Sequence, residues 1–383
     1  MEVVAPFKEV IDEIRESGGE AVQNCFQCGK CDTLCPWNDV TRFSVRRIVR
    51  EALFGLSEIE KEEIWRCTTC GRCPTLCPRD VKQIDDMVAL RRIATRYNVY
   101  PGPVKPIRTI NAGLQSRGNP FNEERQKRKE WAEGLPVKDF DDKTEYLYFP
   151  CCYLSYDPRL KRVAMAVVKI LDKARVDFGL LGEKENCCGE SIRKTGNEDL
   201  YVRLAKENIK TFIENGVKRI ITSSPHCFHT FKNEYPQFMV NFEVIHVTQF
   251  FYKLLKEGKL RINGHYRKRI AYHDPCYLGR HNKVFDEPRE ILKAIPGLEL
   301  IEFEESKMES LCCGMGGGRV WMETPKEERF SNKKVEQALN MGAEELVTSC
   351  PYCITAFEDS RLVLGLGEKI GIKDLTEVLE EVV

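Results

Sequence analysis

The sequence lacks an excess of charge of one sign, a long apolar run and a nucleotide-binding fingerprint. Its 59 Lys and Arg residues balance 59 Asp and Glu residues, so no positive field attracts nucleic acid. No apolar stretch approaches the roughly 20 residues of a membrane helix, and the start is acidic and amphipathic, unlike a signal peptide. We find no flavin or nicotinamide fingerprint. We therefore expect a cytoplasmic chain without a nucleic-acid partner, reaching the inner face of a membrane only through another subunit.

Cysteine, by contrast, is abundant, with 18 residues among 383. Three groups are adjacent pairs, Cys151-Cys152, Cys187-Cys188 and Cys312-Cys313, and bridging neighbours within a pair would distort disulfide geometry. Cytosolic thiols are kept reduced, and a chain of this length, which predicts two or three domains, needs no covalent staples. We therefore interpret the cysteines as metal ligands.

The first 80 residues contain two cysteine quartets of identical spacing. Each reads C-x-x-C-x-x-C-x-x-x-C-P, from Cys25 to Pro36 and again from Cys67 to Pro78, as in bacterial ferredoxins, where the fourth cysteine ligates the other cluster. A structural zinc site instead takes four ligands in separated pairs. We predict two 4Fe-4S cubanes, one held by Cys25, Cys28, Cys31 and Cys77 and the other by Cys67, Cys70, Cys73 and Cys35.

The segment between the quartets predicts an α-helical ferredoxin domain over residues 1–100. Its apolar residues recur at helical spacing and are Val45, Ile48, Val49, Leu53 and Leu56. Residues 101–145 are rich in proline and indicate a linker. The charged run 123–130 within it predicts a solvated helix or, alternatively, a docking surface formed by Arg125, Lys127, Arg128 and Lys129.

An internal repeat fills the remaining chain. Residues 208–227 align with 334–353 without a gap, Cys152-Tyr-Leu aligns with Cys276-Tyr-Leu, and Cys187-Cys188-Gly189 aligns with Cys312-Cys313-Gly314. Each copy has short β-like runs that stop at a cysteine-bearing turn, with amphipathic helical stretches between them. We predict two tandem α/β Rossmann-like repeats, at 146–264 and 265–383, in an α+β multidomain chain with sites at the carboxyl ends of strands.

The two copies differ in their thiols. The second offers five, one more than a cubane uses, which suggests a larger or opened cluster: Cys276, Cys312, Cys313, Cys350 and Cys353. Its glycine-rich stretch 314–318 either aims N–H groups at sulfur or substrate or simply forms a tight loop. The first copy has Ser224 in place of Cys350, with Cys151 as a spare, and keeps a degenerate set that suits a further iron–sulfur cluster or zinc: Cys152, Cys187, Cys188 and Cys227.

Two ferredoxin quartets followed by two such repeats resemble the D subunit of heterodisulfide reductase, a fused C/B-type iron–sulfur protein of the CCG-domain superfamily. The resemblance covers residues 20–358. It implies that an intact cysteine quintet binds a non-cubane 4Fe-4S cluster at which a disulfide such as that of coenzymes M and B is cleaved, with these residues as the catalytic set: Cys276, Cys312, Cys313, Cys350 and Cys353. If the disulfide is anionic, the candidates for binding or protonating it are Arg280, Arg319, Lys283 and His273.

Other functions remain open beside this one. The layout is also similar to iron–sulfur electron-transfer subunits of flavin-dependent glycolate, glycerol-3-phosphate and lactate dehydrogenases. A third interpretation makes both repeats structural zinc modules beside a ferredoxin. The resemblance implies a complex whose partners are a flavoprotein, a membrane cytochrome b subunit, or both, with a small-molecule disulfide or thiol as substrate.

Overall fold

The computed structural model describes residues 6–383, which form two compact units. The first unit contains the chain up to Thr109 together with Ser191–Tyr201 and Gly314–Phe330, and the second contains everything else. Residues 1–5, which begin both the predicted 1–100 domain and the segment that we expect not to be a signal peptide, lie outside the described residues. The predicted domain boundaries at 100, 145 and 264 remain a proposal.

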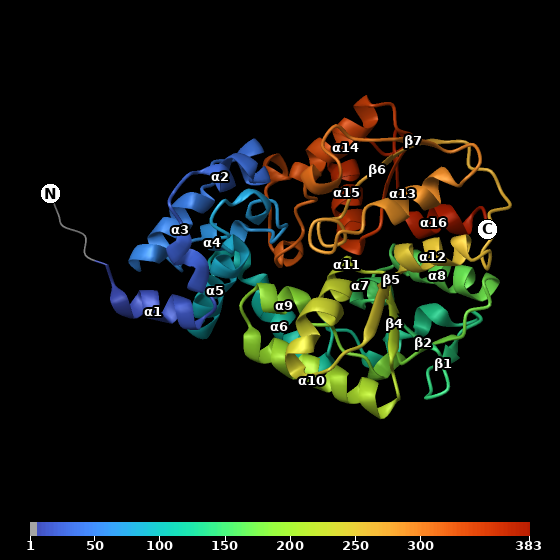
Figure 1. The fold of residues 1–383 in the computed structure, drawn as a ribbon, viewed down its shortest axis with the longest axis horizontal. Coiled ribbons are helices and arrows are strands. Elements are labelled where there is room, and N and C mark those ends of the chain that lie inside the picture. Colours follow the sequence, from blue (N-terminus) through green and yellow to red (C-terminus); the bar gives the residue numbers. More distant parts are fainter. Residues whose placement is uncertain (1–5) are drawn as a thin grey trace. The chain divides into compact units, whose positions relative to one another are not determined.

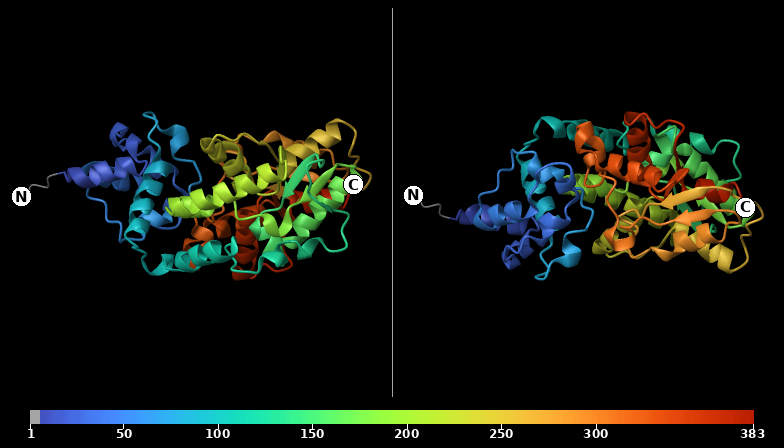
Figure 2. Two further views of the ribbon diagram at one scale, coloured as in Figure 1. Left: turned by 90° about the horizontal axis from the view of Figure 1, so that it is seen from below. Right: turned by 90° about the horizontal axis from the view of Figure 1, so that it is seen from above.

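Up to residue 109 the first unit is helical, as the blue segments of Figures 1 and 2 show. Helix α3 lies between the quartets, as predicted: Ser44 caps it by accepting from the Arg47 amide, and it ends at Gly55 in the left-handed conformation. Its buried face includes Val45, Ile48 and Val49. The helices are α1 (Lys8–Glu16), α2 (Lys30–Leu34), α3 (Val45–Phe54), α4 (Glu63–Arg66), α5 (Gln83–Arg96) and the start of α6 (Pro106–Arg117).

Arg91 on α5 fastens the three segments of the first unit together. It is fully buried, and its guanidinium donates to the carbonyl oxygens of Cys67 (2.6 Å), Lys194 (2.9 Å) and Gly317 (2.9 Å). A planar guanidinium can satisfy several acceptors at once in fixed directions. One side chain therefore joins a ferredoxin loop to a segment of each repeat.

The second unit contains two wholly parallel sheets, ordered β1-β3-β2-β4-β5 and β7-β6-β8-β9. The central strands β2 and β8 are buried at every position, as expected for parallel strands covered on both faces. The strands are β1 (Lys138–Asp139), β2 (Tyr146–Phe149), β3 (Phe178–Leu180), β4 (Arg219–Thr222), β5 (Glu243–His246), β6 (Arg269–Tyr272), β7 (Glu299–Ile301), β8 (Glu345–Thr348) and β9 (Gly371–Asp374).

Helices alternate with these strands, so each repeat has the predicted α/β architecture. The remaining helices are α7 (Cys152–Tyr156), α8 (Lys161–Lys173), α9 (Glu190–Lys194), α10 (Glu198–Glu214), α11 (Pro225–His229), α12 (Val247–Lys256), α13 (Asp286–Lys293), α14 (Phe330–Asn340), α15 (Pro351–Val363) and α16 (Leu375–Glu380). In both sheets the second strand of the repeat, β3 or β7, lies on one side of the first strand, β2 or β6, and the third strand, β4 or β8, lies on its other side. The closer comparison with Rossmann-like folds stays a prediction.

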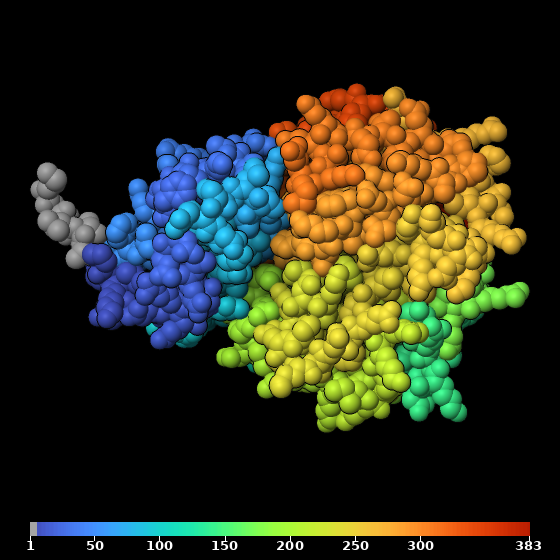
Figure 3. All heavy atoms as spheres, viewed as in Figure 1, coloured from blue at the N-terminus to red at the C-terminus, as the bar shows by residue number. Residues whose placement is uncertain are grey.

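The two repeats pack with approximate two-fold symmetry. Helix α8 of the first repeat contacts α16 of the second, and α12 of the first contacts α13 of the second. Since α8 corresponds to α13 and α12 to α16 in the repeat, these contacts are reciprocal, as in an isologous interface. Figure 3 shows the atoms of the two repeats, green to yellow and orange to red, adjoining in one continuous surface.

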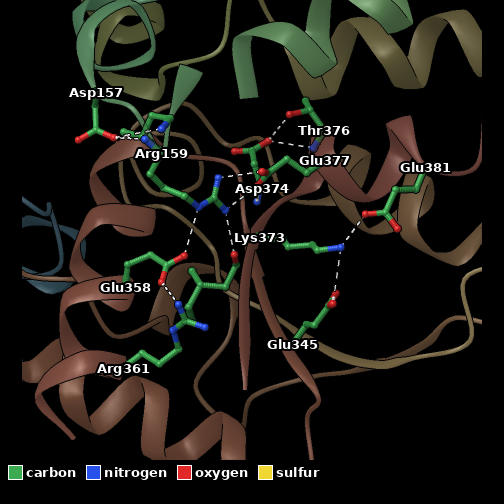
Figure 4. Close-up of polar contacts among 12 residues, drawn as sticks. Asp157, Arg159, Glu345, Glu358, Arg361, Lys373, Asp374, Thr376, Glu377 and Glu381 are labelled. Carbon is green, nitrogen blue, oxygen red and sulfur yellow. Dashed lines mark hydrogen bonds and ion pairs between the residues drawn. The ribbon is translucent and has the colours of Figure 1, made fainter. Parts of the chain in front are cut away.

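Arg159 forms the principal polar link between the repeats (Figure 4). From the loop before α8 it donates to both carboxylate oxygens of Glu377 (2.7 and 2.9 Å), to Glu358 (3.2 Å) and to the carbonyl of Ile372 (2.9 Å). Its guanidinium thus holds α15, β9 and α16 of the second repeat together. None of the helices in the described part of the chain combines the length and apolar character needed to cross a bilayer.

Candidate metal centres

The two ferredoxin quartets have the same backbone conformation on either side of their second cysteines, Cys28 and Cys70. Gln27 and Thr69 precede those cysteines with φ of 64° and 52°, and Gly29 and Gly71 follow them with φ of 81° and 77°. Left-handed residues on both sides of a cysteine turn the chain sharply. The two loops therefore present their closely spaced thiols in the same way.

A pocket of the first unit is lined by four of these thiols, those of Cys35, Cys67, Cys70 and Cys73. Burial, together with the charges of Cys70 and Cys67, raises the pKa of Cys35. The fourth cysteine of the first run therefore lies beside the second run, as the predicted exchange of fourth ligands requires. This supports one ligand set. The other, Cys25, Cys28, Cys31 and Cys77, stays a prediction.

The first cysteine-rich centre gathers five thiols, at the carboxyl ends of β2, β3 and β4. The thiol of Cys187 contacts those of Cys152 and Cys188. The Sγ atoms of Cys188 and Cys227 lie 3.5 Å apart, and the thiol of Cys227 is also hydrogen-bonded to that of Cys151. Four of the five are buried and Cys187 is half-buried. Cys151, which the sequence analysis treats as a spare, therefore lies within the set.

Arg128 corrects the prediction of a solvated charged run over 123–130. It is buried, pairs with the buried Glu185 at 2.9 Å, and points its Nη1 to within 3.4 Å of the Cys152 Sγ atom. Arg125 is also tied inward, to the Asn186 side chain at 2.8 Å. Burial of a guanidinium requires a partner, and here the partners are a carboxylate and a cysteine of the centre. Composition alone gave no sign of this, because charge runs usually face solvent.

The second centre brings together all five predicted thiols, each of them buried. The thiols of Cys276 and Cys312 are hydrogen-bonded to each other, and the thiol of Cys353 is hydrogen-bonded to those of Cys313 and Cys350. Burial opposes ionisation of Cys350, yet hydrogen bonds with Cys353 and His226 lower its pKa to about 5. The centre therefore already contains one thiol that is stabilised as a thiolate.

His226, which stabilises Cys350, comes from the other repeat and was missed by sequence reasoning. Its Nδ1 lies 3.1 Å from the Glu190 carboxylate. Burial lowers the pKa of His226, but Glu190 and Cys350 outweigh it and raise the pKa to about 10. The available signal was its position, because in the alignment His226 stands opposite Tyr352 inside the final cysteine motif.

Aromatic rings fill the space between the two centres. His226 stacks on Tyr277, with ring centroids 4.1 Å apart, and also contacts Tyr352 at 4.4 Å, while Tyr153 contacts Tyr352 at 4.8 Å. Tyr153 is aligned with Tyr277, and His226 with Tyr352, so the contacts are again reciprocal. Each of these residues adjoins a cysteine in sequence. The residue before the last cysteine of each repeat, His226 or Tyr352, thus contacts the tyrosine that follows the first aligned cysteine of the other repeat.

The four candidate substrate residues separate in the structure. Arg280 is buried, and its charge acts on Cys276. His273 is buried and, among residues 6–383, neither of its ring nitrogens has a hydrogen-bond partner. Burial and the charges of Lys334 and Arg280 lower the pKa of His273. Lys283 is exposed, and Arg319 belongs to the first unit, where it pairs with Glu62 at 3.3 Å. Arg280 thus lies by the second centre, and His273 lies within reach of the Arg280 charge.

The glycine-rich stretch 314–318 is a close-packing loop. A Cβ added at Gly316 would lie 2.3 Å from the Thr68 carbonyl oxygen, and one at Gly317 would lie 2.4 Å from the Cys67 oxygen. Gly317 also has φ of +61°, which disfavours side chains. Of the two interpretations of this sequence, the structure supports the tight loop, and its packing partner is the loop of the second quartet.

The gathered side chains suit iron–sulfur clusters by their chemistry. Thiolates are the ligands of such clusters, and each cysteine-rich centre has a buried cationic group at its edge, Arg128 or Arg280, to offset their charge. Among residues 6–383 no His, Cys, Asp or Glu group has the geometry of a site for a single metal ion.

Comparisons with known proteins agree with this organisation. Residues 146–232 and 270–358 match the cysteine-rich domain CCG, and residues 21–81 match a 4Fe-4S dicluster domain. A crystal structure of a hypothetical protein from Helicobacter pylori has a TM-score of 0.54 at 12% identity, covering 98% of this chain and 72% of that chain. At this identity the match bears on the fold alone.

Three curated relatives are similar over most of the chain. The probable iron-sulfur-binding oxidoreductase FadF of Bacillus subtilis is 39% identical over 70% of this chain and 39% of its own length. The EtfAB:quinone oxidoreductase of Syntrophomonas wolfei is 43% identical over 61% and 34%. The D subunit of the dihydromethanophenazine:CoB–CoM heterodisulfide reductase of Methanosarcina barkeri is 33% identical over 69% and 64%.

The chain thus spans between about a third and two thirds of the length of these relatives. The matched domains account for all the cysteine sets described above. The chain belongs to the CCG-domain iron–sulfur proteins, joining a 4Fe-4S dicluster domain to two cysteine-rich domains, and is homologous to the D subunit of heterodisulfide reductase.

Proposed function

We propose that the chain is the iron–sulfur subunit of a heterodisulfide reductase-like complex. Electrons would pass through two 4Fe-4S cubanes, held by the two quartets, to a non-cubane 4Fe-4S cluster at the second cysteine-rich centre, where a disulfide such as CoM-S-S-CoB is reduced. The observation that carries the proposal is the convergence of five buried thiols there, Cys276, Cys312, Cys313, Cys350 and Cys353. It is supported by the similarity to the Methanosarcina reductase.

The chemistry needs several one-electron carriers, because cleaving a disulfide takes two electrons and each cluster supplies one at a time. The residues of the chain contribute charge and position. His226 donates a hydrogen bond to Cys350, and Glu190 keeps that imidazole protonated. Arg280 adds a second positive charge beside Cys276. Both groups favour accumulation of negative charge at this centre during reduction.

We propose a complex as the working form of the protein. Relatives include subunits of heterodisulfide reductase and of a fumarate reductase, and a probable membrane-anchored ferredoxin is 33% identical over 78% of this chain. A flavoprotein, a membrane cytochrome b subunit, or both would deliver electrons. The chain itself would be cytoplasmic and would approach the membrane through such a partner.

A second candidate function is electron transfer between a flavoprotein and a quinone, without disulfide chemistry. The similarity to the EtfAB:quinone oxidoreductase and to FadF, at 43% and 39% identity, favours it. Among the electron-transfer alternatives, these relatives favour transfer to a quinone over service as a subunit of a flavin-dependent glycolate, glycerol-3-phosphate or lactate dehydrogenase. In this function all clusters would serve as relays.

Electron paramagnetic resonance distinguishes the two. Anaerobically purified protein is oxidised with and without a thiol such as coenzyme M, and iron is counted per chain. We expect at least about 12 iron atoms and a thiol-dependent signal unlike that of a cubane. Cys353→Ser should abolish that signal, whereas the control Cys28→Ser, in the exposed part of the first quartet, should leave it. A spectrum indifferent to thiol would reject disulfide reduction and favour the quinone pathway.

A further inference from the structure

We propose that Cys151 is the fifth ligand of the first cysteine-rich centre, replacing the thiol that Ser224 lacks, and that this centre holds a five-thiolate iron–sulfur cluster. The inference rests on the proposed function only in taking the cysteine-rich centres as iron–sulfur sites. It changes the status of the first repeat from a degenerate copy to a complete one with a relocated ligand.

The order of contacts among the thiols carries the proposal. In the second centre the contacts run from Cys312 to Cys276 and from Cys313 through Cys353 to Cys350. In the first centre they run from Cys187 to Cys152 and from Cys188 through Cys227 to Cys151. Cys151 therefore stands to Cys227 as Cys350 stands to Cys353.

The alignment shows an exchange of positions and not a simple loss. The residue aligned with Cys151 is Pro275, which has no thiol, and the residue aligned with Cys350 is Ser224. Each repeat thus has one thiol at one of two alternative places. A zinc ion takes four ligands, so five gathered thiols exceed its need, whereas a cluster of several iron atoms would offer more than four places for thiolates.

The backbone at Cys151 indicates that its placement matters. It has φ of 84° and ψ of 152°, a region that is essentially reserved for glycine and is strained for other residues. Such conformations persist only where the surrounding structure holds them, and they cluster at functional sites. Glycine would relieve this strain, yet the position has a buried cysteine, 7% exposed.

The Ser224 hydroxyl, unlike the aligned thiol of Cys350, has no hydrogen bond to a cysteine in the described part of the chain. It is fully buried, and in the described part of the chain its Oγ has no hydrogen-bond partner. A hydroxyl buried in this way is destabilising. The aligned Cys350, by contrast, is hydrogen-bonded to Cys353 and His226.

The matched variants are Cys151→Gly, which removes the thiol while suiting the backbone, and Ser224→Ala, which removes the unpartnered hydroxyl. Full-length protein is purified anaerobically, iron is counted, and Mössbauer spectra are recorded after ⁵⁷Fe reconstitution, with circular dichroism as the test of folding. Cys188→Ser identifies the spectral component of the first centre.

We expect Cys151→Gly to lose the Mössbauer component of the first centre, with iron falling from about 16 to about 12 atoms per chain. Ser224→Ala should keep this component and the wild-type iron content. Adding Ser224→Cys to Cys151→Gly should restore the component. If Cys151→Gly retains wild-type iron and spectrum and is more stable, Cys151 is a strained structural residue and the inference is wrong. Wild-type protein with only about 8 iron atoms would instead contradict the proposed function, so the two failures are distinguishable.

Discussion

Asp86 is a buried acid whose titration couples the stability of the first unit to pH. It lies on α5 with no exposed surface, and within residues 6–383 neither of its carboxyl oxygens has a hydrogen-bond partner. Burial, with a smaller effect of the neighbouring Asp85 charge, raises its pKa to about 8. The folded protein therefore keeps a proton that the unfolded chain, with a pKa near 3.9, releases.

The sign of the effect follows from this difference in bound protons. The contribution of Asp86 to stability is greatest below about pH 4 and falls as the pH rises towards 8, because unfolding releases the Asp86 proton in that window. We predict that Asp86→Asn raises the melting temperature at pH 8, by an amount equivalent to about 1–3 kcal/mol, and much less at pH 5. Thermal unfolding at the two pH values tests this, with the exposed Asp85→Asn as control. Equal effects of both variants would show that burial of Asp86 is not the cause.

At the scale of elements, Arg159 decides how firmly the two repeats hold each other. It is partly buried and binds Glu377 with two hydrogen bonds. Lys169 also crosses between the repeats, to Glu380 at 3.0 Å, but its side chain is 45% exposed. Paired charges that are shielded from water contribute more than exposed ones, whose attraction is screened.

We therefore predict that Arg159→Ala lowers the free energy of unfolding by about 1–3 kcal/mol, whereas Lys169→Ala lowers it by less than about 0.5 kcal/mol. Denaturant unfolding monitored by circular dichroism measures both. Similar small losses would mean that the repeats are held together by apolar packing alone.

The elements were largely predictable, and their long-range contacts were not. Helix α3 and the cysteine-bearing turns follow from local spacing. His226 beside Cys350 and Arg128 beside Cys152 join segments that have no common spacing in sequence, so only tertiary packing reveals them. The same holds for Arg91, which reaches Lys194 across 103 positions. Local patterns thus gave the thiols, and packing gave the groups that surround them.

For the whole molecule, the loop 314–318 ties a segment of the second repeat to a ferredoxin quartet. Gly317 and Gly365 have nearly the same φ, +61° and +64°, but only at Gly317 would a Cβ meet another group, the Cys67 oxygen, while Gly365 has nothing within 4 Å. The pair separates the effect of the clash from the cost of a left-handed residue.

We predict that Gly365→Ala costs about 1–2 kcal/mol, whereas Gly317→Ala costs clearly more and displaces the Cys67 loop. Melting temperature, iron content and the cubane signals of the full-length protein measure the outcome. Loss of cubane iron in Gly317→Ala alone is expected, and identical behaviour of both variants would show that the loop tolerates displacement.

The discontinuity of the first unit also has a consequence for biosynthesis. Its ferredoxin segment ends at Thr109, but its last segment ends at Phe330, about 220 residues later. At 5–20 residues per second, the ribosome needs roughly 10–40 s to supply it. Throughout that interval both quartets have been translated while the Cys67 loop lacks its glycine cover. Cluster insertion therefore has a period of open access to the nascent chain, which closes only when the second repeat emerges.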